Sequence, residues 1–156
     1  SPTQRDRLRG EHMGVIFQQF NLLPYLGIQA NLLLPVRLFA SRAQASAQQW
    51  GDPVSQARAL SQSLGLPDSH WNQPVHQLSV GQQQRVAAAR SLMGAPRLVI
   101  ADEPTSALDE THQDEFLNLL LSTADRQKAS VVMVSHNPRL AERFHQVLSL
   151  SKGEVT

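Results

Sequence analysis

Two adjacent carboxylates stand at the end of an apolar run. Residues 98–101 read Leu-Val-Ile-Ala, and Asp102, Glu103 and Pro104 follow directly. Carboxylates at the tip of a strand usually serve a metal ion, a water molecule or a phosphate group. Successive strand side chains project in different directions, so Asp102 and Glu103 are expected to have different tasks. For an isolated Asp-Glu pair, the alternative interpretation is a solvated acidic turn.

A second candidate lies at residues 78–85, which read LSVGQQQR. Ser79 and Gln82 have the spacing of a capping box, which predicts a helix from Ser79 to about Met93. A helix N-terminus exposes free N–H groups and the positive end of its dipole, which favour an anion. Gly81 lacks the Cβ that would block a phosphate. Taken alone, this pattern favours a plain capping box.

Composition narrows the classes of protein. The 156-residue chain is 41% hydrophobic and 17% charged, which suits a single globular domain. A net charge of +1 supplies no basic field for a phosphate backbone, so no nucleic-acid partner is expected. The lack of cysteine excludes disulfides and thiolate metal sites. No signal peptide or membrane-length apolar run is visible, so we expect any membrane role to be peripheral.

Three zones position these residues. A short strand at 13–17 opens the first zone, residues 1–21. Residues 22–93 are rich in Gln, Ala, Ser and Leu and predict helices. Within them, Asp52-Pro53 is a helix start and Gly65 a helix stop.

The third zone, residues 94–156, alternates strand and helix. Apolar strands at 98–101 and 131–134, joined by a helix from Asp114 to Lys128, indicate a βαβ unit. Their continuous apolar character predicts a parallel sheet buried on both faces. Residues 147–150 predict a further strand that enters a tight turn at 151–154.

The ordered set of motifs closely resembles the ATP-binding cassette (ABC) ATPase family. Phe17-Gln18 resembles the Q-loop, LSVGQQQR the signature motif, LVIADE the Walker B motif and SALD (106–109) the D-loop, while His136 resembles the switch histidine. The resemblance extends from about Arg9 to Gly153. Within the family, GVIFQQFNLLP and GQQQRVAAAR most resemble the lipoprotein-releasing and macrolide-export type. The family resemblance implies an α/β fold. This fold would be a partial P-loop-type ABC ATPase core, with a mostly parallel sheet and an inserted helical subdomain.

The resemblance also implies roles at the strand ends. Asp102 would hold Mg²⁺ through a coordinated water, and Glu103 would orient or deprotonate the water that attacks ATP. His136 would hydrogen-bond the γ-phosphate, and Gln18 would lie between metal, water and the helical subdomain. Without the resemblance, Gln18 is an ordinary loop residue and His136 a structural one.

Further implied roles concern a second subunit. Ser79, Gly81 and Gln82 would contact the nucleotide held by the partner, and Asp109 would bridge to that partner. The alternative for Asp109 is an N-cap of the following helix. Two residues depart from the family pattern: Val80 stands where the signature has glycine, and Asn137 stands where many members carry an acid.

The implied function is that of the ATPase subunit of a membrane ABC transporter, with ATP and Mg²⁺ as cofactors. Its expected partners are a transmembrane permease subunit and a second ATPase subunit, at the inner face of the cell membrane. One alternative is a DNA-repair or chromosome-maintenance ATPase, which would need coiled-coil heptads or a zinc hook that the sequence lacks. Another is a non-catalytic interaction fragment.

The family's Walker A loop has no counterpart in these residues. The chain looks like the C-terminal two thirds of a cassette, and we expect it to be inactive alone. The missing strand would lie between the strand ending at His136 and residues 147–150. Unpaired sheet edges can pair with strands of other chains. If Ser1 is the true start, we therefore expect an oligomer in which segments are exchanged between chains, or another closely packed oligomer.

Overall fold

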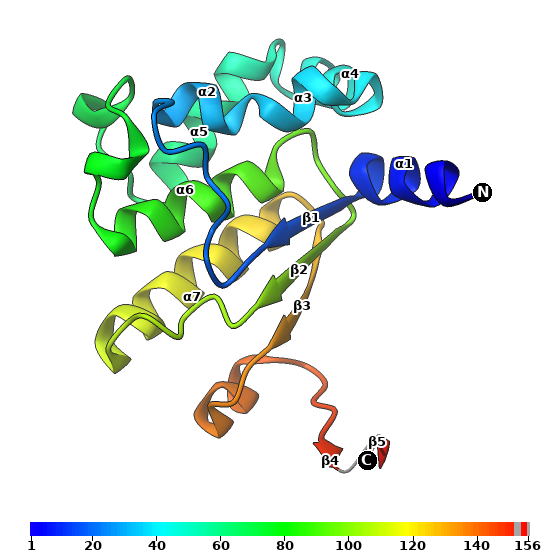
Figure 1. Cartoon of the computed structure of the whole chain (residues 1–156), viewed down its shortest axis with the longest axis vertical. Coiled ribbons are helices and arrows are strands. Elements are labelled where there is room, and N and C mark those ends of the chain that lie inside the picture. The colour runs from blue at the N-terminus through cyan, green and yellow to red at the C-terminus, as the bar shows by residue number, and fades with distance from the viewer. Residues whose placement is uncertain (152–153, 156) are drawn as a thin grey trace.

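Three parallel strands form the platform of the molecule (Figure 1). In the computed structural model, which describes residues 1–151 and 154–155, the strands lie in the order β1, β2, β3. They span Met13–Ile16, Leu98–Asp102 and Ser130–Val134. The register places Ala101 between Ile16 and Met133, so all three carboxyl ends meet at one edge of the sheet.

Helices make up most of the remaining described chain. No described helix combines the length and the apolar character needed to cross a membrane. The helices are α1 (Pro2–His12), α2 (Ile28–Leu32), α3 (Leu34–Leu38), α4 (Ala40–Trp50), α5 (Pro53–Ser63), η1 (Asp68–His70), η2 (Val75–Gln77), α6 (Val80–Leu92), α7 (Glu110–Arg126) and η3 (Pro138–Arg143).

The predicted helix starts are confirmed by their caps. Asp52 accepts hydrogen bonds from the backbone N–H groups of Val54 and Ser55, at 2.8 and 3.0 Å, at the start of α5. The hydroxyl of Ser55 also donates to this carboxylate and is the main cause that lowers the pKa of Asp52. Helix α5 ends just before Gly65, whose φ of +68° suits a residue without Cβ.

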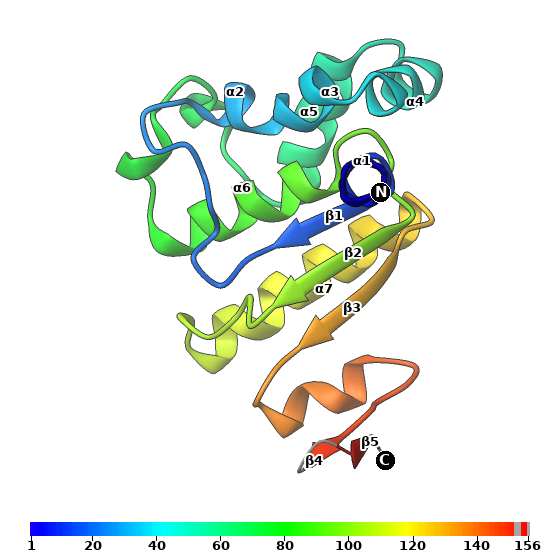
Figure 2. The same cartoon turned by 45° about the vertical axis from the view of Figure 1, so that its right-hand side comes forward.

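Helices α6 and α7 cover one face of the sheet (Figure 2). The centre of α6 is fully buried, since Val86, Leu92 and the three alanines at 87–89 are 0% exposed. Small side chains let this helix approach β1 closely. A Cβ on Gly14 would lie 2.1 Å from the carbonyl oxygen of Ser91, so only glycine fits there.

A buried arginine joins the helical segment to the sheet. The Arg42 side chain, on α4, donates to the carbonyl oxygens of Met93 at 3.0 Å and Met13 at 2.6 Å. Its surroundings remove water from the guanidinium and lower the pKa of Arg42 to about 10. Arg42 therefore connects α4 to the end of α6 and the start of β1.

The expectation that both faces of the sheet are buried is wrong for the described chain. Ile16, Val99 and Ala101 face α6 and α7 and are 0% exposed. Side chains of the opposite face remain accessible, and Val132 and Val134 are 52% and 49% exposed. The physical reason is that α6 and α7 lie on the same side, so the apolar run of β3 is covered once rather than twice.

The C-terminal tail also differs from expectation. Of the strand predicted at 147–150, only Leu150 is in a strand, β4 (Leu150–Ser151), which pairs antiparallel with β5 (Glu154–Val155). Val147 and Leu148 are exposed, because the chain leaves the sheet after β3 and these two residues pair with no strand among the described residues. The centre of the predicted turn, residues 152–153, lies outside the described residues.

The connecting helix begins earlier than its sequence suggests. It was expected from Asp114 to Lys128, whereas α7 runs from Glu110 to Arg126. Asp109 caps it by accepting a hydrogen bond from the backbone N–H of His112 at 3.0 Å. The predicted βαβ unit, β2–α7–β3, is confirmed as parallel.

Candidate active site

The carboxyl ends of the strands bring four predicted residues to one edge of the sheet. Gln18 follows β1, Asp102 ends β2, Glu103 comes next, and His136 follows β3. Nε2 of Gln18 donates to the hydroxyl of Ser106 at 3.5 Å, which links the segment after β1 to the segment after Glu103. The parallel register produces this gathering, because residues distant in sequence leave the sheet at the same level.

Glu103 has the most constrained position in this group. Its φ of +45° is unusual for a residue with a Cβ, and its backbone N–H donates to the carbonyl of Val134 at 3.0 Å. The side chain is only 15% exposed, yet Oε1 is buried without a hydrogen bond among the described residues. Nε2 of His136 lies 3.4 Å from this oxygen on a side chain that is 97% exposed. A carboxylate with an unused acceptor beside an exposed imidazole can hold a water molecule.

Asp102 is exposed, and its side chain has no hydrogen bond or ion pair to other described residues. The described ranges contain no cluster of three or more His, Asp or Glu residues able to enclose a metal ion. This arrangement fits Mg²⁺, which keeps several of its waters and takes one or two protein carboxylates. It does not suit a metal that needs a closed protein cage.

The start of α6 forms a separate group. The hydroxyl of Ser79 accepts from the backbone N–H of Gln82 at 3.2 Å, and Oε1 of Gln82 accepts from the N–H of Ser79 at 3.0 Å. The predicted capping box is therefore confirmed. Among the described contacts, none joins these two residues to Asp102, Glu103, His136 or Gln18.

Open space surrounds Gly81. A Cβ added there would meet nothing nearer than Cδ2 of Leu108 at 4.0 Å, so the fold of this chain does not require glycine. Glycine within a helix costs about 0.5–1 kcal/mol relative to alanine. An open backbone at the positive end of a helix fits an anionic group approaching from outside. Val80, which departs from the family pattern, is 50% exposed.

Asp109 is held on α7. The backbone hydrogen bond from His112 is the main cause that lowers the pKa of Asp109, and a contact with the His112 ring adds to it. Nδ1 of His112 lies 2.8 and 2.7 Å from the two carboxylate oxygens. The N-cap interpretation is thus confirmed, while contact with a partner stays a prediction.

Arg90 is a functional candidate that sequence reasoning missed. Phe20 and Asn21, just after Gln18, have φ values of +62° and +48°. The guanidinium of Arg90 donates to both of their carbonyl oxygens at 2.7 Å, and burial lowers the pKa of Arg90. Two successive left-handed residues are strained and need such support. An arginine within the alanine-rich stretch of α6 was the only signal in the sequence.

Removing this support should destabilise the fold. We expect Arg90→Ala to lower the free energy of unfolding by about 2 kcal/mol, because two hydrogen bonds from a charged donor are lost. Denaturant unfolding would measure the change. Arg37→Ala, at an exposed arginine whose side chain has no described hydrogen bond, is the matched control. Adding Asn21→Gly should recover part of the loss by relieving the backbone, and equal stability of the Arg90 and Arg37 variants would disprove the role.

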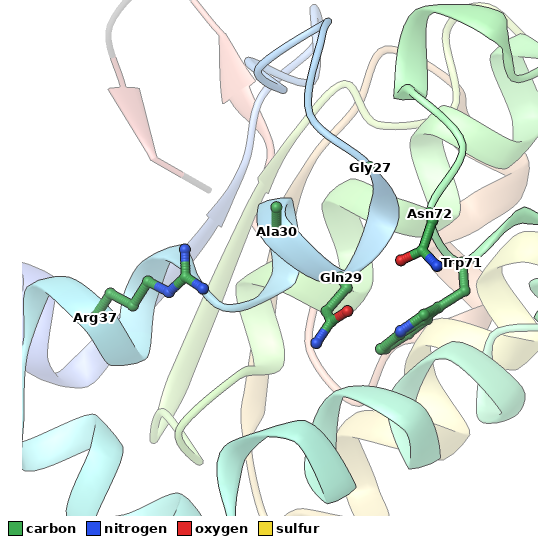
Figure 3. Close-up of a pocket in the computed structure, with 6 residues that line it drawn as sticks. All are labelled: Gly27, Gln29, Ala30, Arg37, Trp71 and Asn72. Carbon is green, nitrogen blue, oxygen red and sulfur yellow. The ribbon is translucent and has the colours of Figure 1, made fainter.

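A pocket of about 220 Å³ lies elsewhere, between α2, α3 and the segment after η1 (Figure 3). The guanidinium of Arg58 stacks over the ring of Trp71 at 4.2 Å from its centroid. No predicted site residue lines this pocket, so it is distinct from the edge of the sheet. Its lining residues are Gly27, Gln29, Ala30, Arg37, Trp71 and Asn72.

The fold is that of an α/β protein, with its candidate site at the carboxyl ends of parallel strands. A family model described as ABC transporter matches residues 2–106. The chain belongs to this family.

Similar proteins agree with this family assignment. The chain is 38% identical over 148 residues to the lipoprotein-releasing system ATP-binding protein LolD of Rickettsia bellii, covering 95% of this chain and 63% of that protein. It is 37% identical over 155 residues to the macrolide export ATP-binding/permease protein MacB of Escherichia coli, covering 99% and 23%. A dimeric structure of the ATP-binding cassette MJ0796 bound to ADP and Pi matches with a TM-score of 0.81 and 32% identity, covering 99% and 65%. The chain thus spans less than two thirds of each relative's length.

Proposed function

We propose that this chain supplies the water-activating part of an ATP-hydrolysing site in an ABC transporter. The observation that carries the proposal is the buried, unbonded Oε1 of Glu103 beside Nε2 of His136. A buried carboxylate without a hydrogen bond is costly unless another group completes it. A water positioned to attack the γ-phosphate of ATP is such a group.

The neighbouring residues have complementary tasks in this proposal. Glu103 orients the water and accepts its proton, and His136 donates to the γ-phosphate from the exposed side. Gln18, tied to Ser106, can act as donor and acceptor at the same edge without adding charge. Asp102 would hold Mg²⁺, which supplies charge neutralisation at the phosphate oxygens when bound.

A second ATPase subunit would complete the site. Ser79, Gly81 and Gln82 would serve nucleotide held by the partner, because their helix end is open but not joined to Glu103 in this chain. Asp109 would contact that partner. The MJ0796 cassette described as dimeric and bound to ADP and Pi supports this arrangement.

The names of the relatives support a membrane partner. One relative is named an ATP-binding/permease protein and another an ATP-binding protein of a lipoprotein-releasing system. We therefore propose a transmembrane permease partner and a peripheral position on the inner face of the cell membrane. Coupling to transport would use the helical segment, residues 22–93.

The assignment of Asp102 to Mg²⁺ gives a direct test. In the full-length protein, Asp102→Asn should raise the Mg²⁺ concentration needed for half-maximal ATPase activity by about tenfold, since a neutral amide is a weaker ligand for a hard cation. Asp125→Asn, at an exposed aspartate near the end of α7, is the control. An unchanged Mg²⁺ requirement in Asp102→Asn would remove Asp102 from the metal site.

A further inference from the structure

Gln113 bridges two segments that carry predicted site residues. Its Nε2 donates to the carbonyl oxygen of Thr105 at 3.2 Å and to that of Leu108 at 2.8 Å. Its Oε1 accepts from Nδ2 of Asn137 at 3.1 Å. The first two carbonyls belong to the chain leading to Asp109, whereas Asn137 directly follows His136.

Backbone groups at both ends fix the orientation of the two amides. Carbonyl oxygens can only accept, so the NH₂ group of Gln113 faces Thr105 and Leu108, and its oxygen is left for Asn137. At the other end, Oδ1 of Asn137 accepts from the backbone N–H of Arg139 at 3.1 Å. Its NH₂ group therefore faces Gln113. Each donor in this series of hydrogen bonds therefore faces an acceptor.

The departure at position 137 gains a physical meaning from this pattern. An acid at that position has no N–H to offer the oxygen of Gln113. The carboxylate of such an acid would gain a hydrogen bond only if Gln113 turned its NH₂ group toward position 137. The hydrogen bonds from Gln113 to Thr105 and Leu108 would then be lost. Asn137 thus leaves the Gln113 donors free for both carbonyls.

We propose that Gln113 and Asn137 are a matched pair of positioning residues that hold residues 105–108 to the segment carrying His136. This inference rests on the proposed function, because it concerns how Asp109 and His136 are held for ATP hydrolysis. The bridge starts on the first turns of α7, whose cap is Asp109 itself. A displacement of the partner-facing Asp109 is therefore passed to the residue next to His136 through two amide side chains.

The test uses isosteric changes in the full-length protein. Asn137→Asp and Gln113→Glu each replace a donor by an acceptor facing another acceptor. Hydrogen exchange without nucleotide should become about tenfold faster at Leu108, whose N–H is bonded to the carbonyl of Thr105. The value of kcat for ATP should fall about fivefold to tenfold with little change in KM. Asn118→Asp is the matched control on the same helix, since Asn118 accepts a hydrogen bond from Arg143 and does not contact residues 105–108.

A compensating pair separates positioning from general damage. Gln113→Lys offers donors only, so combined with Asn137→Asp it should restore slow exchange and most of kcat, whereas Gln113→Lys alone should not. Unchanged exchange at Leu108 in both single variants, or no recovery in the double variant, would overturn the matched pair. The exchange measurement needs no ATPase activity. A wild-type protein without hydrolysis would therefore overturn the proposed function and leave the bridge to be judged by exchange alone.

Discussion

Glu103→Gln in the full-length protein is expected to bind ATP normally and to lose about 10²-fold or more of its turnover, the scale of a lost general base. The change is isosteric, so the buried side chain keeps its volume and the φ of +45° is unaffected. The amide presents one oxygen and cannot accept the proton of the attacking water. Because hydrolysis would no longer separate the subunits, an ATP-bound dimer should accumulate.

Single-turnover hydrolysis and solution molar mass in the presence of ATP would measure both effects. Glu142→Gln, at an exposed glutamate on η3, is the matched control and should behave like the wild type. Hydrolysis close to the wild-type rate in Glu103→Gln would show that Glu103 is not the base. Loss of ATP binding would assign it to the nucleotide pocket rather than to the water.

Gly81→Asp is the second change with a large expected effect. Inside one chain it should be harmless, because the position is open to 4.0 Å and an acid in the first turn of a helix interacts well with its dipole. The free energy of unfolding should therefore remain the same or rise. If the triphosphate of a partner subunit approaches this turn, the new carboxylate repels it. ATP-dependent dimerisation and hydrolysis should then be abolished, while ATP binding by the monomer remains.

Gly81→Ala separates charge from size. It adds a methyl group without charge, so a milder loss than in Gly81→Asp would assign the effect to electrostatics. Molar mass with and without ATP, together with denaturant unfolding of both variants, gives the comparison. Normal ATP-dependent dimerisation of Gly81→Asp would refute the assignment of residues 79–82 to the partner's nucleotide.

Local signals in the sequence were sufficient for the elements that begin with a cap. Asp52 and Ser79 make their cap contacts with the following backbone, so neighbours in sequence determine them. The parallel βαβ unit was predictable for a similar reason, because two apolar runs joined by a helix have few other arrangements. The sequence marks Asp109 as a possible cap, yet its apolar pattern predicts a helix only from Asp114, four residues after the observed start of α7.

Contacts between distant segments were not predictable. Arg90 reaches carbonyls 69 and 70 residues away, and Asn137 meets Gln113 at a separation of 24. Single amide and guanidinium side chains give no periodic signal in the sequence. The left-handed backbone at Phe20 was not predictable either, because no glycine stands at that position. The sequence did not predict that only one face of the sheet is covered by helices. Apolar strand residues indicate a preference for burial, but they do not show whether a second layer is present to bury them.

The pairing of β1 with β2 joins two segments that are made far apart in time during synthesis. The two strands are neighbours in the sheet, yet β1 ends at residue 16 and β2 begins at residue 98. At a synthesis rate of about 5–20 residues per second, β1 waits on the ribosome for several seconds before its partner is made. Helices α2 to α6 are complete within that interval, and α6 can already pack against β1. The helical segment can therefore shield the inner face of β1 before its described partner strand is made, and docking of β2 is the slow, non-local step.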